Sequence, residues 1–228
     1  MDIHKPNPWH GWREFLKEYA IIVVGVLTAL AAEQVVEMLH WRHLVEVERR
    51  AMLAEVRGNL GAVQARVNLQ PCVSHRLEEL QLVFQRRARG EPLGVKGVVG
   101  VPVPIGSPKD SWNIAISGQG LSHVPYEEQV ELSSAFTNFA NWDNIRREER
   151  EAWVKLATLD QPEGLTESDW AQLRQAYAQA RAASRRVAQV GPFILAHASV
   201  GQKPDESPSP AELFKAAGYG GELCQPLI

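Results

Sequence analysis

The chain has 228 residues, of which 45% are hydrophobic and 22% charged, and its formal net charge is -3. These ordinary globular values exclude wholesale disorder and fibrous repeats. The balance of charge gives no overall positive field that would hold nucleic acid. Two cysteines are too few for a disulfide-dense scaffold or a four-cysteine zinc site.

The N-terminal part contains an uncharged apolar run, YAIIVVGVLTALAA, at residues 19–32. This run alone is shorter than the roughly 20 residues that cross the hydrocarbon of a bilayer. If the helix tolerates Glu33 and Glu37 and continues to Leu39, it covers roughly 30 Å, which matches the hydrocarbon thickness. We therefore predict a transmembrane helix over residues 19–41, preceded by an interfacial segment over residues 1–18.

Tryptophans flank this helix on both sides. Trp9 and Trp12 precede it and Trp41 follows it. As one helix, Trp12 and Trp41 would lie roughly 43 Å apart, close to the distance between the two headgroup layers. The three tryptophans are predicted to form interfacial belts.

Two other interpretations of the apolar run stay open. Basic residues before it and the small-x-small pattern Ala29-Leu30-Ala31 also fit a cleaved signal peptide, and a buried helix of a soluble protein is the third alternative. The helical period continues past the cleavage point to Leu39, which favours an uncleaved anchor. Because long domains cross membranes largely regardless of charge, we expect the short N-terminal tail in the cytoplasm and residues 43–228 outside the cytoplasm.

Gly25, Ala29 and Glu33 are spaced by four residues and share one face of the predicted span. Small residues at this spacing allow close helix packing, and an intramembrane carboxylate usually faces protein or water. This face predicts contact with another transmembrane subunit or with a second copy, in addition to lipid. The alternative is that Glu33 reaches toward the interface and binds nothing.

The part after Trp41 is predicted to be mostly helical. Apolar residues recur at helical steps through Val67 and again from Val73 to Phe84, with an interruption at Pro71. Residues 90–108, rich in Gly, Val and Pro, predict an extended loop with at most one short strand. A short helix over residues 112–117 follows, capped by Asp110 or Ser111.

Two long helices complete this part. The first opens at Pro125 and has a broad apolar face through Leu159, with residues 146–151 predicted as its charged side. The second opens with a capping box of Thr166 and Asp169, and residues 191–192, Gly-Pro, are predicted to bend or break it. The fold class is thus mainly α: a transmembrane helix that continues into a helical bundle over residues 42–200. Residues 201–228 form a linker, a short helix from Ser209 and a tail.

Cys72 and Cys224 are the two cysteines. In an oxidising compartment a disulfide between them would tie the tail to the first bundle helix. The alternative is a pair of separate buried thiols, which a cytoplasmic domain would favour.

The sequence shows no catalytic motif and predicts no cofactor. Glu37 and His40 form one Glu-x-x-His pair, whereas a di-iron bundle needs two such pairs and further glutamates. We therefore expect an interfacial polar cluster there, and a metal enzyme that uses Glu33, Glu37 and His40 is the weakest functional candidate.

Two stretches carry a resemblance. EYAIIVVGVLTALAAEQ at residues 18–34 and WNIAISGQGL at residues 112–121, followed by a helix with Pro and Glu at its start, resemble a group of uncharacterised bacterial single-span membrane proteins. The likeness covers most of the chain, which departs from the group in its PWHGW-containing N-terminus and its Cys224 tail. The resemblance implies a membrane anchor with a helical outer domain and supplies no catalytic residue.

From these features we expect a non-catalytic, membrane-anchored accessory or scaffold subunit of a larger membrane complex. Its span would contact partners and its helical domain would cover them. The alternative is a homo-oligomeric membrane-anchored sensor or small-ligand-binding protein, in which the aromatic helices enclose an apolar ligand.

Overall fold

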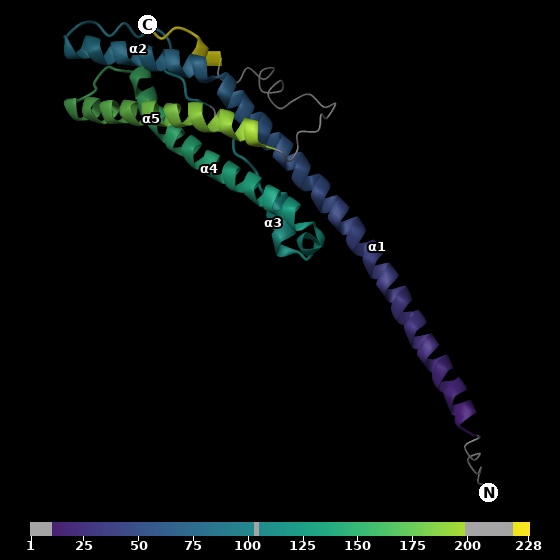
Figure 1. The fold of residues 1–228 in the computed structure, drawn as a ribbon. Helices are drawn as coiled ribbons and strands as arrows, with labels where there is room; N and C mark the ends of the chain where they lie inside the picture. The colour runs from purple at the N-terminus through teal and green to yellow at the C-terminus, as the bar shows by residue number, and fades with distance from the viewer. Residues whose placement is uncertain (1–10, 103–104, 199–220) are drawn as a thin grey trace.

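The computed structural model describes residues 11–102, 105–198 and 221–228. Its first helix, α1 (Gly11–Asn68), has 58 residues and is therefore roughly 87 Å long. Figure 1 shows the N-terminal half of α1 projecting as a rod away from the other helices. The C-terminal half packs into the bundle, where Met52, Val56 and Val63 are fully buried.

The projecting half of α1 contains a segment that is long and apolar enough to cross a membrane. The mean hydropathy of its 18-residue window is 2.0, and none of that window is buried within the chain. A core helix of a soluble protein would be mostly covered, so this exposure argues against the buried-helix alternative. The helix begins at Gly11, earlier than the predicted Tyr19, and Trp9 lies outside the described residues.

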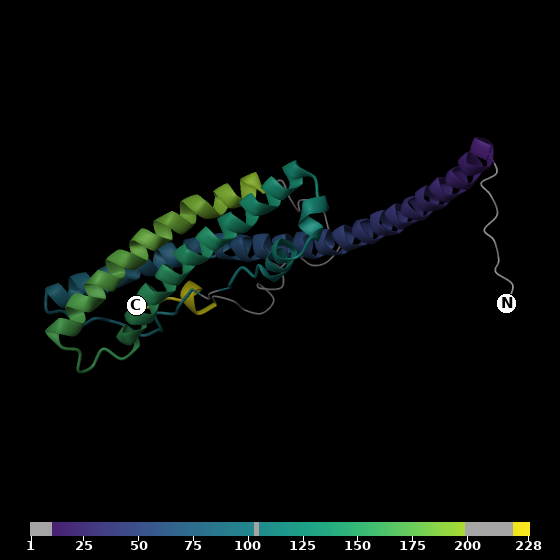
Figure 2. The same ribbon diagram turned by 90° about the horizontal axis from the view of Figure 1, so that it is seen from below.

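The bundle consists of the second half of α1, α2 (Gln70–Ala88), α4 (Tyr126–Leu156) and α5 (Glu167–His197). The helix is interrupted at Leu69, between α1 and α2. Pro71 lies in the first turn of α2, where its missing N–H costs no helical hydrogen bond. The predicted interruption thus falls two residues earlier than Pro71 itself. Helices α4 and α5 form an antiparallel hairpin through η2 (Ala157–Asp160), and α5 packs on α1, α2 and α4 (Figure 2).

Two apolar clusters fill the bundle. The cluster nearer the projecting half of α1 joins α1 residues to Phe136, Phe139 and Trp142 of α4. The second cluster joins α2, the end of α4 and the start of α5 around Trp153 and Trp170. The aromatic side chains on the predicted apolar face of α4 therefore lie in the packed interior.

Of the two outcomes predicted for Gly191 and Pro192, a bend or a break, the break does not occur, because α5 continues through them to His197. Gly191 serves close packing instead. A Cβ at this position would lie 2.5 Å from Cγ2 of Val67 and 3.2 Å from the Trp142 ring, so only glycine lets α5 approach α1 this closely.

A short helix, α3 (Asp110–Ser117), and a 3-10 turn, η1 (Gly120–His123), lie against α1. The predicted cap of α3 is wrong: neither Asp110 nor Ser111 caps it with its side chain. The Glu55 carboxylate of α1 accepts hydrogen bonds from the Asp110 and Ser111 amides, at 2.9 and 3.1 Å. Among the described residues of the preceding loop, none forms a strand. The helix predicted from Ser209 lies outside the described residues, and the tail contains η3 (Gly221–Cys224).

Candidate functional site

The predicted contact face of the span is uncovered within the described chain. Gly25, Ala29 and Glu33 are all exposed, and a Cβ placed on Gly25 would meet no atom within 4 Å. The structure thus places the three residues on an open helix surface. None of the other described helices packs on this surface.

Immediately after the span, α1 is braced by a distant part of the chain. The ring of Trp41 stacks on His123 of η1, with centroids 4.2 Å apart, and its indole N–H donates to Glu37 Oε1 at 3.3 Å. We define the collar as residues 118–128 together with the α1 segment 41–49 on which they rest. Trp41 is thus half-buried in the collar, whereas Trp12, at the opposite end of the span, is 73% exposed.

Two further contacts fix the collar to α1. The Glu48 carboxylate lies directly against Gly120, so a side chain larger than hydrogen there would collide with it. Arg49 forms a hydrogen-bonded ion pair with Glu128 in the first turn of α4, which contributes to raising the pKa of Arg49. The first turn of α4 and η1 are therefore held at a defined height along α1.

A shallow groove of about 560 Å³ runs along α1 beside the collar. Its walls include Glu37, Glu46 and Arg42 of α1 and His123 of η1, together with apolar side chains at positions 38 and 45. The groove therefore spans the end of the predicted transmembrane segment and the start of the domain, and it carries charges of both signs.

The metal interpretation of Glu37 and His40 finds no geometric support. Glu37 accepts a hydrogen bond from Trp41, and the His40 ring lies edge-on to the same indole at 5.4 Å. Among the described residues, no group of three or more His, Cys, Asp or Glu side chains is arranged to hold a metal ion.

A buried charge network lies in the middle of the bundle. Glu149, with no exposed side-chain surface, receives two hydrogen bonds from Arg66 of α1, at 2.5 and 3.2 Å, and one from Arg146. Burial lowers the pKa of Arg146 to about 10, so the guanidinium is still charged at neutral pH. The prediction that residues 146–151 form a charged outer side is thus wrong for these two residues.

The error can be traced to the helical period. Arg146 follows Phe139 by seven residues, and Glu149 follows Trp142 by seven, so both lie on the buried stripe of α4. The spacing alone therefore predicts that Arg146 and Glu149 are buried. It does not predict their partner Arg66, which lies 83 residues before Glu149 and completes the network.

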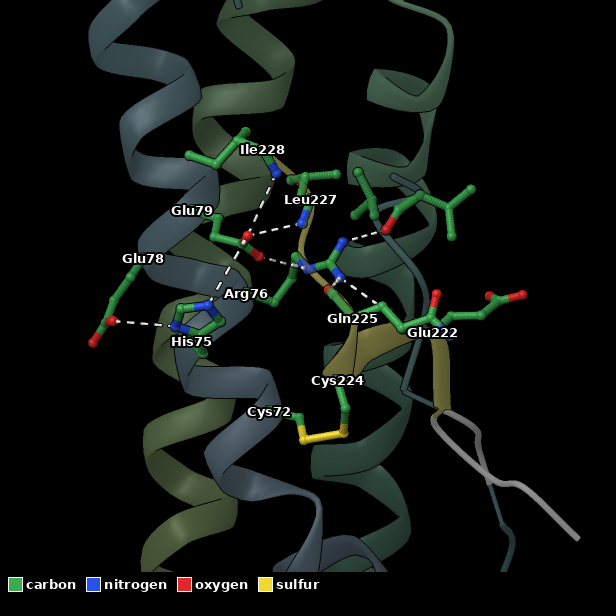
Figure 3. A network of polar contacts seen from close by, with 12 residues as sticks. Cys72, His75, Arg76, Glu78, Glu79, Glu222, Cys224, Gln225, Leu227 and Ile228 are labelled. Carbon is green, nitrogen blue, oxygen red and sulfur yellow. Dashed lines mark hydrogen bonds and ion pairs between the residues drawn. A yellow bond between two sulfur atoms is a disulfide. The ribbon is translucent and has the colours of Figure 1, made fainter. Parts of the chain in front are cut away.

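The tail forms a clasp on α2, which Figure 3 shows at close range. A disulfide joins Cys72 to Cys224, which is one of the two alternatives that the sequence leaves open. Arg76, which has no exposed surface, donates to the backbone carbonyls of Glu222 and Gln225, at 3.0 and 2.5 Å, and burial is the main cause that lowers its pKa.

A second set of contacts orders the end of this tail. Glu79 accepts from the Leu227 amide at 2.7 Å and forms an ion pair with Arg76 at 3.1 Å. The Lys96 and Gly97 amides donate to the Leu227 carbonyl, at 2.8 and 3.1 Å. Sequence reasoning found the cysteine pair and missed Arg76 and Glu79, whose partners are backbone atoms far along the chain.

Comparison with known protein families, curated proteins and solved structures finds no match to this chain. The resemblance to single-span bacterial membrane proteins therefore stays a prediction.

Proposed function

We propose that this chain is a membrane-anchored, non-catalytic accessory or scaffold subunit of a larger bacterial membrane complex. The observation that carries the proposal is the fully exposed apolar window of α1, on a helix that continues without a break into the core of the bundle. Such a helix anchors the domain and holds it rigidly against whatever packs on the span.

Two features support the rest of the proposal. The open face of Gly25, Ala29 and Glu33 suits a transmembrane partner, because small residues allow close approach and a carboxylate seeks a polar partner in hydrocarbon. The disulfide, whose Cys224 is exposed, supports a domain in the oxidising periplasm with the N-terminal tail in the cytoplasm. The cysteine-bearing bundle would then cover or brace partners outside the inner membrane.

The test is extraction from the native membrane in mild detergent, followed by native electrophoresis and identification of the proteins that migrate with the chain. We expect defined subunits at a fixed ratio. Migration as a homo-oligomer would replace this proposal with the alternative, a homo-oligomeric sensor or ligand-binding protein. Migration as a monomer would refute the subunit proposal.

Variants in the span make this test specific. Gly25→Leu places a large side chain on the proposed contact face, whereas Ala31→Leu places the same side chain about 160° around the helix from the centre of that face and about 120° from Gly25. We expect Gly25→Leu and Glu33→Gln to release the partners and Ala31→Leu to retain them. Equal retention by all three variants would refute the contact face.

A further inference from the structure

The collar lies at the height where the proposed span leaves the hydrocarbon. Leu39 is the last apolar residue of the predicted span, and Trp41 is two residues, or roughly 3 Å, further along α1. Because His123 stacks on Trp41 at 4.2 Å, the tip of η1 reaches this same height. Each headgroup layer is roughly 5–8 Å thick, so the tip of η1 falls within it.

We propose that the collar is a second membrane contact, in which η1 and the start of α4 rest on the lipid surface and phospholipid headgroups fill the groove beside them. This inference rests on the proposed span. It adds to that proposal, because it places residues about 80 positions beyond Trp41 in the headgroup layer. This second contact would fix the position of the domain relative to the membrane surface.

The exposed side chains at this end suit a lipid surface. Tyr126, next to η1, is 74% exposed, and tyrosine is enriched at membrane interfaces. Exposed large apolar side chains also lie near η1, on α3 and in the first turns of α4. They are Ile114, Ile116 and Val130.

The groove provides the complementary charges. Arg42 and His123 suit the phosphate of a headgroup, whereas the carboxylates of Glu37 and Glu46 suit its ammonium. A zwitterionic headgroup such as that of phosphatidylethanolamine carries both. The ion pair of Arg49 with Glu128 holds this arrangement on α1.

The experiment measures the membrane depth of single spin labels on the full-length protein. Both cysteines of the chain are used in the disulfide, so one introduced cysteine at a time can be labelled. The positions are Val26→Cys in the span, Ser122→Cys and Tyr126→Cys in the collar, and Glu163→Cys in the exposed connection at the opposite end of the bundle. The protein is placed in nanodiscs of phosphatidylethanolamine with a minor share of phosphatidylglycerol, and collision rates with oxygen and with a water-soluble nickel complex are compared.

We expect the Val26 label at hydrocarbon depth, the Ser122 and Tyr126 labels at headgroup depth, and the Glu163 label in water. The nickel collision rate at both collar positions should be several-fold below that at Glu163. If Val26 is in hydrocarbon but the collar labels collide with nickel as often as Glu163, the collar contact is refuted and the span stands. If Val26 is itself in water, the span and the collar contact both fail.

A pair of tryptophan variants tests whether the stack sets the height. Trp41→Ala in the Tyr126→Cys background removes the ring on which His123 rests, and we expect the nickel collision rate to rise toward that of Glu163. Trp12→Ala, at the other end of the span, is the matched control and should leave the rate unchanged. An unchanged rate in Trp41→Ala would refute the role of the stack in seating the collar.

Discussion

Replacing Glu149 by Gln tests the buried charge network most directly. The side chains of Arg66 and Arg146 are 3% and 5% exposed, and Glu149, at 0%, is the carboxylate between them. The variant removes the buried carboxylate with which both guanidiniums pair. Breaking a buried ion pair by removing one partner typically costs about 3–5 kcal/mol, so we expect a loss of that size in the free energy of unfolding.

The adjacent residue supplies a matched control. Glu148 pairs with Arg186 at the surface, where the two side chains are 58% and 45% exposed, so Glu148→Gln should cost about 0–1 kcal/mol. The measurement is guanidinium unfolding in detergent, followed by the fluorescence of the buried tryptophans. If Glu149→Gln loses no more stability than Glu148→Gln, the assignment of the network to the bundle core is refuted.

Three further perturbations probe the clasp and the start of α5. Reducing the bond between Cys72 and Cys224 opens a loop with a sequence separation of 152, and the chain-entropy relation gives a loss of about 5 kcal/mol; equal melting temperatures with and without dithiothreitol would contradict this. Gly97→Ala puts a Cβ 2.5 Å from the Pro226 carbonyl oxygen, so the tail should shift at a cost of about 1–3 kcal/mol, with faster amide exchange in the tail and unchanged exchange in α5. The Thr166 hydroxyl and amide hold the pKa of Asp169 below its ordinary 3.8, so the stability that this carboxylate adds is complete above that value and fades as pH falls through the lowered pKa. The stability difference between the native protein and Asp169→Asn should therefore shrink in acid, and a difference independent of pH would count against the capping box.

Local patterns predicted much of this fold. The helical periods placed the long helices, and the capping box of Thr166 and Asp169 is confirmed at the start of α5. These features depend on residues within a few positions of one another, which a sequence displays directly. The start of α3 was predicted wrongly because its amides are satisfied by Glu55, more than 50 residues earlier in the chain.

In the candidate site too, the sequence predicts the features that depend on nearby residues and misses those that depend on distant ones. The apolar run and the spacing of Gly25, Ala29 and Glu33 are local, and so the sequence shows them. The collar depends on Trp41 meeting His123, a pairing between residues 82 positions apart, and no motif marks either partner. The sequence predicts Trp41 only as an interfacial belt residue. In the structure its ring stacks on His123 of η1.

The continuity of α1 connects the span to the interior of the bundle. The helix that carries Gly25 also carries Trp41 in the collar, Arg66 in the charge network and the break at Leu69. A partner that tilts or rotates the span must therefore act on the collar and then on the core, because no described residue between Gly11 and Asn68 interrupts the helix. The disulfide clasp lies just beyond this rod, on α2, where it ties the tail to the second apolar cluster. If the proposed span is anchored in a membrane, its displacement would reach the bundle through one continuous helix, as the proposed scaffold role requires.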